Sequence, residues 1–196
     1  MARSGLRSPE DTALAGAVAA LARPGGLVLY PTETVYGIGG RASDGASALR
    51  LAALKGRSPG ALLVLVLEVT LPWEPARRLA EAFWPGPLSI VIPAFGDVHP
   101  AVLGPDGTVG VRVPAHPLAR RLVAAVGPVT SSSANRTGEP PVRDPARCVL
   151  AVDAVLDGGV LPPSPGSTLV RGDTGEVLRE GAVPSVAVAR VLGRLR

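Results

Sequence analysis

The chain has 196 residues, of which 46% are hydrophobic and 18% charged, so we expect one compact domain with a sizeable core. Its single cysteine excludes an intramolecular disulfide, and its two histidines, far apart in sequence, argue against a His/Cys metal centre. The longest strongly apolar run, residues 61–67, is far shorter than the roughly 20 residues of a membrane helix. Glu10 and Asp11 precede the first apolar stretch and suit a cytosolic helix better than a signal peptide. The composition therefore favours a cytoplasmic protein with no membrane span and no metal site of its own.

The balance of charges points to anionic partners. The formal net charge is +4, which favours binding of nucleotides or RNA. Among the 20 basic residues, Lys55 is the only lysine. Lysine and arginine are not equivalent as phosphate ligands, so this lone ammonium is a candidate functional group, with chance retention as the alternative.

The predicted elements alternate between helix and strand. Ser8, Pro9 and the acids after them predict the start of a helix that Gly25 can close. Residues 27–30 predict a short buried strand, the pair Ser43 and Asp44 can cap a helix that runs to about Lys55, and residues 61–67 predict a central strand covered on both faces. The remaining pattern predicts helices at 75–83, 117–126 and 184–195, strands at 88–92, 109–113 and 128–130, and a hairpin of 168–170 with 176–178. Such alternation indicates an α/β domain with a mixed sheet.

Four segments are more polar or richer in glycine than their positions beside buried strands require, namely residues 31–37, 55–57, 111–114 and 130–138. Ligands of open α/β sheets gather at strand ends, so these segments are candidates for one site. In the first segment, Thr32, Thr34 and Tyr36 alternate as they would on one face of a strand that borders the site, and the alternative is ordinary exposed alternation in a sheet.

Lys55, Gly56 and Arg57 stand where a predicted helix ends. The glycine lets the backbone turn, so the ammonium and the guanidinium can converge on a polyphosphate. The alternative is a basic helix end that faces the negative end of the macrodipole, and spacing alone favours it.

Two further segments have open interpretations. The run from Thr130 to Asn135 carries hydroxyls, an amide and backbone N–H groups that can cradle an anion, or it is a solvated turn. Arg112 lies in an apolar strand pattern, where an unpaired charge is costly, so it is either ion-paired in the fold or awaits a ligand carboxylate. A Walker-type phosphate loop, a dinucleotide fingerprint and a Gly-x-Ser-x-Gly elbow are absent from the sequence.

Five segments occur in a fixed order: Pro-Thr-Glu-Thr-Val-Tyr-Gly-Ile at 31–38, Lys-Gly-Arg at 55–57, Trp-Pro-Gly-Pro-Leu-Ser at 84–89, Val-Gly-Val-Arg-Val-Pro at 109–114 and Ser-Ser-Ala-Asn-Arg-Thr-Gly-Glu-Pro at 132–140. Together they resemble the motifs of the YrdC-like threonylcarbamoyl-AMP synthases. Segments at 157–159, 166–170 and 178–182 extend the resemblance to about residues 10–192.

This resemblance implies a fold and a reaction. The fold is a twisted mixed sheet with flanking helices and a positively charged concave cavity, in a single domain over residues 1–196. The reaction converts L-threonine, bicarbonate or CO2, and ATP with its Mg2+ into L-threonylcarbamoyladenylate and pyrophosphate, which makes the enzyme a nucleotidyltransferase. The product serves N6-threonylcarbamoyladenosine formation at position 37 of tRNA, through a separate transferase.

The resemblance also assigns residues to roles. The reacting anions and ATP would be held by Lys55, Arg57, Ser133 and Asn135. Threonine would be bound by Thr32, Arg112, Ser131 and Ser167. Arg179 would reach the nucleotide phosphates.

The sequence departs from the family pattern after Arg57, where Ser-Pro-Gly-Ala-Leu at 58–62 is shorter and less polar than the usual loop. A paralogue with a different carbamoyl substrate is therefore an alternative. A non-catalytic RNA-binding protein is another, suggested by the basic charge, although the six aromatic residues offer poor platforms for base stacking.

Overall fold

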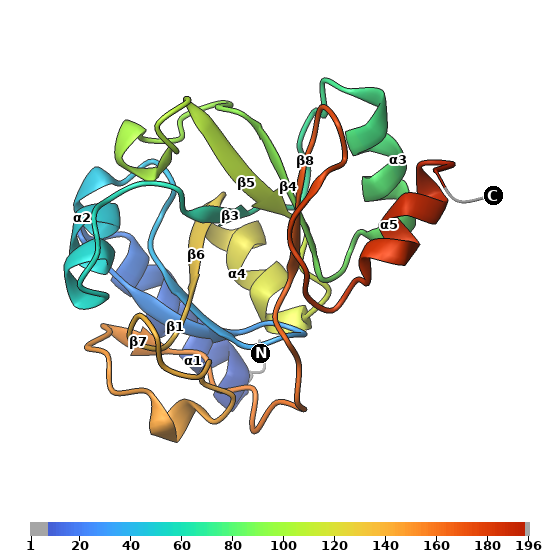
Figure 1. Ribbon diagram of the computed structural model, residues 1–196. Coiled ribbons are helices and arrows are strands. Elements are labelled where there is room, and N and C mark those ends of the chain that lie inside the picture. Colours follow the sequence, from blue (N-terminus) through green and yellow to red (C-terminus); the bar gives the residue numbers. More distant parts are fainter. Residues whose placement is uncertain (1–7, 195–196) are drawn as a thin grey trace, which may run out of the picture.

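Side-chain caps fix the two helices that bracket the first strands. We describe residues 8–194 from a computed structural model (Figure 1). Helix α1 (Pro9–Leu21) begins at Ser8, whose hydroxyl accepts from the Asp11 backbone N–H at 3.1 Å while the Asp11 carboxylate accepts from the Ser8 backbone N–H. Helix α2 (Gly45–Leu54) is capped by Asp44 and ends at Lys55. Both starts agree with the sequence-based prediction.

The strands form one mixed sheet of nine strands in the order β7-β1-β2-β6-β3-β5-β4-β8-β9. Their bounds are β1 Val28–Pro31, β2 Tyr36–Gly39, β3 Leu63–Leu65, β4 Leu88–Pro93, β5 Thr108–Arg112, β6 Val129–Ser133, β7 Ala154–Val155, β8 Thr168–Arg171 and β9 Val177–Arg179. Strand β3 pairs parallel with β5 and antiparallel with β6, so it lies at the centre of the sheet. The mixed pairing confirms the predicted fold class.

Helices cover the sheet in two groups (Figure 1). Helix α1 packs against α4 (Pro117–Val126), and both bury apolar residues against β1, β3 and β6 in one core cluster. A second, larger cluster joins α2 and α3 (Glu74–Phe83) to β2, β4, β5 and β8. Helix α5 (Ser185–Val191) lies against α3 beside the β8–β9 hairpin. In the described part of the chain, the structure contains no helix long and apolar enough to cross a membrane.

The structure corrects the predicted elements at four places. Strand β3 spans Leu63–Leu65, not residues 61–67, because the chain turns at Gly60 and Ala61, which both have positive φ. Strand β6 continues to Ser133, so the serines belong to a strand and not to a turn. Residues 32–35 form a tight turn, and Tyr36 begins the unpredicted β2. Helix α5 ends at Val191, and Leu195 lies outside the described residues.

Helix α2 offers a direct test of the core. Leu51 is fully buried in the larger cluster, whereas Leu49 on the same helix is 53% exposed. Truncation of a buried leucine removes the transfer free energy of the deleted atoms and leaves a cavity. Leu51→Ala should therefore lower the free energy of unfolding by about 2–5 kcal/mol. The matched Leu49→Ala should change it by less than about 0.5 kcal/mol. Urea denaturation of both variants measures the difference, and equal effects would contradict the packing described here.

Candidate active site

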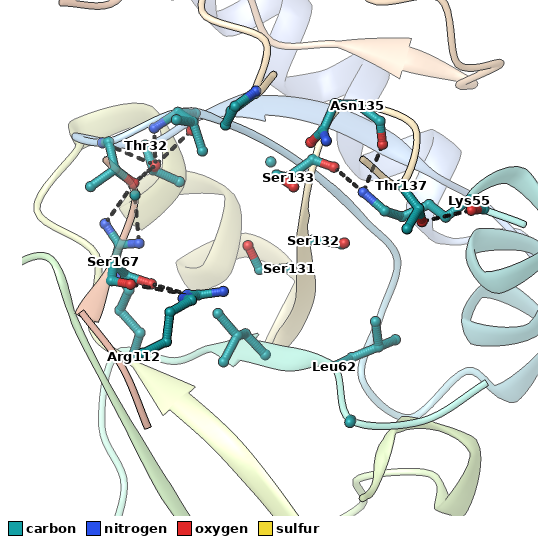
Figure 2. A pocket seen from close by; sticks show the side chains of 18 of the residues that line it. Thr32, Lys55, Leu62, Arg112, Ser131, Ser132, Ser133, Asn135, Thr137 and Ser167 are labelled. Carbon is teal, nitrogen blue, oxygen red and sulfur yellow. Dashed lines mark hydrogen bonds between the residues drawn. The ribbon is translucent and has the colours of Figure 1, made fainter. Parts of the chain in front are cut away.

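Strand β6 borders a cavity at its end. On one edge it pairs with β3 from Val129 to Ser131, and on the other it pairs with β2 at Ser132 and Ser133. The three serines line a cavity of about 400 Å³. Its lining includes every residue to which the resemblance assigned a role: Thr32, Lys55, Arg57, Arg112, Ser131, Ser133, Asn135, Ser167 and Arg179 (Figure 2).

Lys55 joins the end of α2 to the end of β6. Its Nζ donates to the backbone carbonyls of Ser133 at 2.6 Å and Asn135 at 2.7 Å. The residue is 7% exposed. Burial, and secondarily the charge of Arg57, lowers the pKa of Lys55 to about 8. An ammonium has three donors, so one remains for a ligand in the cavity.

The loop after β6 is held by its own side chains. Asn135 donates from Nδ2 to the carbonyls of Arg136 and Glu139, and Thr137 donates its hydroxyl to the Lys55 carbonyl at 2.8 Å. The buried Oδ1 of Asn135 has no partner among the described residues. The amide therefore gives its donors to the loop, and its one free atom is an acceptor, which does not suit a phosphate oxygen.

Arg57 lines the cavity from the loop between α2 and β3. Gly56, with φ of +62°, turns the chain there into the left-handed region. Arg57 itself is exposed, in contrast to the buried Lys55. The pair thus places one fixed and one accessible cation on the same side of the cavity.

Arg112 ends β5 and lies on the side of the cavity opposite Lys55 (Figure 2). It is 4% exposed, its Nε donates to the Gly86 carbonyl at 3.0 Å, and both terminal nitrogens lie 3.3 Å from Thr34 Oγ1. Glu33 Oε1 pairs with its NH2 at 2.6 Å. Of the two interpretations open from the sequence, the structure shows the ion-paired one, and the guanidinium also borders the cavity.

Thr32 organises the turn between β1 and β2. Its hydroxyl oxygen accepts from the backbone N–H groups of Thr34 and Val35, and it donates to the Val35 carbonyl at 2.7 Å. Thr34 Oγ1 lies 2.9 Å from Thr32 Oγ1, which links this turn to Arg112. Tyr36 does not share their face, because its hydroxyl donates to the Gly159 carbonyl outside the cavity.

Arg179, at the end of β9, approaches the cavity from the last hairpin. Its NH2 donates to the Ser167 carbonyl at 3.0 Å, and Ser167 accepts from Ser89 Oγ at 3.0 Å. Burial, followed by repulsion from Arg112, lowers the pKa of Arg179. Two guanidinium groups therefore influence each other at this end of the cavity.

The described lining is electropositive in its composition. It contains Lys55, Arg57, Arg112 and Arg179, and no Asp or Glu among the described residues that line it. Hydroxyls of threonine and serine fill the space between the cations. Such a surface is suited to a ligand with several negative charges.

Three residues that shape this site have no individual role in the sequence-based prediction, although all three lie in segments singled out as candidates. Thr34 lines the cavity, Thr137 lines it and anchors the loop after β6, and Glu33 pairs with Arg112. The alternation of Thr32 with Thr34 was a usable signal for Thr34. Nothing local indicated the pairing of Glu33, because its partner is 79 positions away in the chain and only the sheet brings them together.

The family model for Sua5, YciO and YrdC, described as telomere recombination, matches residues 20–181. The chain belongs to this family. A threonylcarbamoyl-AMP synthase of Chromohalobacter salexigens is 41% identical over 183 residues, which cover 85% of this chain and 96% of that protein. A threonylcarbamoyl-AMP synthase of Coxiella burnetii is 37% identical over 171 residues, covering 80% and 91%.

A solved member of the Sua5/YciO/YrdC family has the same fold. The crystal structure of Pyrococcus abyssi Sua5 complexed with L-threonine matches with a TM-score of 0.81 and 31% identity. The match covers 97% of this chain but 60% of the Pyrococcus chain, so this chain spans about three fifths of that protein. The α/β fold with a mixed sheet and flanking helices, which the resemblance implied, is therefore confirmed.

The lone lysine makes the charge state of the site directly measurable. Because Lys55 is the only lysine, protein labelled with 13C-lysine should give a single side-chain Cε signal. When the pH is varied, the chemical shift of this signal should titrate with a midpoint near pH 8, since burial disfavours the charged form of the lysine. Adding ATP should move the midpoint upward, because a bound polyanion favours the ammonium. A midpoint near the ordinary lysine value of about 10.4 would contradict the burial described here.

Proposed function

We propose that this protein is an L-threonylcarbamoyladenylate synthase, a nucleotidyltransferase that uses L-threonine, bicarbonate or CO2, and ATP. The observation that carries the proposal is the cavity itself, whose described lining joins four cations to a set of hydroxyls without a carboxylate. Membership of a family whose relatives have this activity by name supports the same conclusion.

The chemistry requires neutralisation of charge and alignment of the reactants. The amine of threonine loses a proton and adds CO2 to give a carbamate. A carbamate oxygen then forms a bond to the α-phosphorus of ATP while the bond to the β-phosphate oxygen breaks and pyrophosphate leaves. This displacement needs no nucleophile from the protein, so positioning and electrostatic stabilisation carry most of the catalysis.

Lys55 and Arg57 are proposed to hold the reacting phosphates. The free donor of Lys55 is fixed by the two carbonyls that hold its Nζ, so the ammonium needs little reorganisation when negative charge develops. Arg57, which is exposed, can follow the phosphates as they enter and leave. Ser133 adds a hydroxyl, and Asn135 keeps the loop in place around the lysine.

Arg112 is proposed to bind the threonine carboxylate at the other end of the cavity, with Thr32, Ser131 and Ser167 nearby. Arg179, whose charge interacts with that of Arg112, is proposed to reach from there to the nucleotide phosphates. Mg2+ is proposed to enter with ATP. The described lining offers hydroxyls and amides but no carboxylate, and carboxylates are the usual protein ligands of Mg2+. The phosphates themselves would therefore supply most of its ligands.

Several wider roles belong to the same proposal. The single domain would act in the cytoplasm and pass its product to a separate transferase that modifies adenosine 37 of tRNA. Direct binding of tRNA is compatible with the positive net charge. The proposal does not require it.

An assay of the purified protein tests the activity. Pyrophosphate should be released when ATP, bicarbonate and labelled threonine are all present, and omission of any one should abolish the release. Release that does not depend on threonine would overturn the assigned reaction. Salt-sensitive binding of tRNA without binding of ATP would instead favour an RNA-binding protein.

Replacement of the buried lysine tests the phosphate site. Lys55→Ala should lower kcat/KM for ATP by at least about tenfold, or more than roughly 1.4 kcal/mol of transition-state stabilisation. The matched control is Arg147→Ala, which also removes one positive charge but from a side chain that is 85% exposed. It should stay within about twofold of the wild type, as expected of a surface residue. Equal losses in both variants would indicate a general effect of charge and would remove Lys55 from the mechanism.

A further inference from the structure

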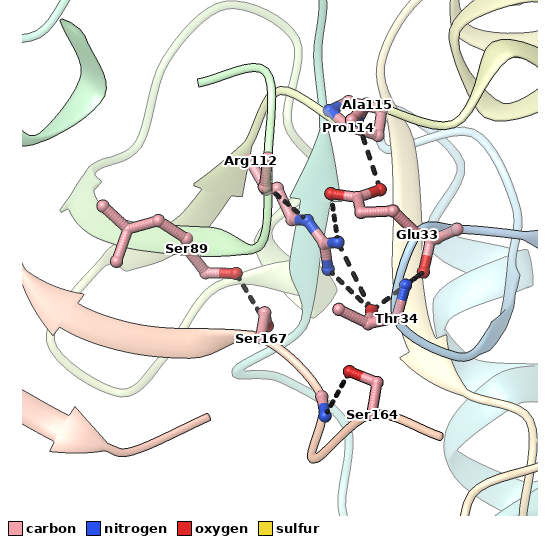
Figure 3. Close-up of polar contacts among 12 residues, drawn as sticks. Glu33, Thr34, Ser89, Arg112, Pro114, Ala115, Ser164 and Ser167 are labelled. Atoms are coloured by element: carbon pink, nitrogen blue, oxygen red, sulfur yellow. Dashed lines mark hydrogen bonds and ion pairs between the residues drawn. The ribbon is translucent and has the colours of Figure 1, made fainter. Parts of the chain in front are cut away.

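Glu33 contacts Arg112 from outside the cavity. It lies in the turn between β1 and β2, and it does not line the cavity although its neighbours Thr32 and Thr34 do. Its Oε1 pairs with Arg112 NH2 at 2.6 Å, and its Oε2 accepts from the backbone N–H of Ala115 at 3.2 Å (Figure 3). The carboxylate thus bridges the guanidinium and the chain just beyond β5.

We propose that Glu33 is a positioning residue that sets both the orientation and the net charge of Arg112 for the amino-acid carboxylate. This inference rests on the proposed function and deepens it, since it identifies what makes one end of the cavity selective for the amino acid.

The orientation follows from the contacts of the guanidinium. Its Nε is held by the Gly86 carbonyl, Thr34 Oγ1 lies between the two terminal nitrogens, and Glu33 holds NH2. These three partners come from two separate segments of the chain, so the plane of the guanidinium is fixed before any ligand arrives. The N–H groups of Arg112 that remain free are held in one orientation by these contacts. Less conformational entropy of the side chain is therefore lost when a carboxylate binds.

The net charge at this end of the cavity is set by Arg112 and by the charged residues near it, Arg179 and Glu33. Arg112 is buried, and the exposed Arg179 at the end of β9 is close enough for the two positive charges to interact. Without Glu33 this end would carry two uncompensated positive charges and would attract phosphate groups. With Glu33 its net charge is one, which matches the single carboxylate of the amino acid. Among the described residues, neither Lys55 nor Arg57, at the other end, forms an ion pair with a carboxylate. Glu33 therefore separates an amino-acid end from a phosphate end.

The experiment is steady-state kinetics of Glu33→Ala and Glu33→Gln, followed by release of pyrophosphate. Glu33→Ala should raise KM for threonine by about tenfold or more, while KM for ATP stays within about twofold, because the effect is confined to one end of the cavity. Glu33→Gln keeps an oxygen beside Arg112 but loses the charge, so its KM for threonine should rise less. Inorganic phosphate should compete with threonine more strongly in both variants than in the wild type.

A double-mutant cycle tests whether Glu33 acts through Arg112. In an Arg112→Ala background, Glu33→Ala should change KM for threonine by less than about twofold, since the group it positions is gone. The control is Glu81→Ala, an exposed glutamate on α3, which should leave all parameters unchanged. Should Glu33→Ala fail to fold, as judged by thermal unfolding, Glu33→Gln takes its place in the cycle.

The outcomes separate the two proposals. An active wild type with an unchanged KM for threonine in Glu33→Ala overturns the role of Glu33 alone. Additive effects in the cycle, or an equal rise in KM for ATP, also overturn it, because they would indicate a general structural effect. A wild type that releases no pyrophosphate in response to threonine overturns the proposed function, and the role of Glu33 falls with it.

Discussion

The site depends on a buried ammonium held by two backbone carbonyls. Lys55 ends α2, and the carbonyls of Ser133 and Asn135 belong to the end of β6 and the loop after it. A charged group withdrawn from water must be paired or hydrogen-bonded, and bonds to a charged donor are worth about 1.5–3 kcal/mol each. The fold therefore keeps α2, β6 and the following loop in a fixed relation. The same relation aims the remaining donor of the lysine at the space that a ligand would occupy.

The three arginines of the cavity differ in their exposure and in the groups that hold them. Arg57 is exposed and free to follow a ligand, whereas Arg112 is buried and held by Gly86, Thr34 and Glu33. Arg179 is tied to Ser167 at the edge of the last hairpin. Four positive charges in a small space repel one another, so a fold that carries them must compensate or separate them. Arg112 is compensated by the Glu33 carboxylate, and Arg57 is left in solvent. Lys55 and Arg179 are hydrogen-bonded to neutral groups.

Segments that are polar in sequence prove to serve the site in two ways. Lys55, Arg112 and Ser131 border the cavity directly, and so does Thr137, whose hydroxyl also donates to the Lys55 carbonyl. Ser89 acts behind the cavity, because its hydroxyl donates to the hydroxyl of the lining residue Ser167. Gly86 contributes only a carbonyl, to Arg112, and its lack of a side chain is required because a Cβ there would lie 2.3 Å from the Phe83 carbonyl oxygen. A ligand-binding loop thus needs partners that never touch the ligand.

The sequence by itself determined the local elements and the candidate residues. Ser8 and Asp44 cap their helices because a cap depends on residues a few positions apart, and the hairpin of β8 with β9 follows from its glycine-rich turn. The ordered motifs indicated the family, which the comparisons confirmed. Only the tertiary structure decided that β6 extends through the serines, that β3 is short, and that Glu33 pairs with Arg112. These features depend on strand pairing and on contacts between residues distant in the chain, and no local pattern of residues specifies them.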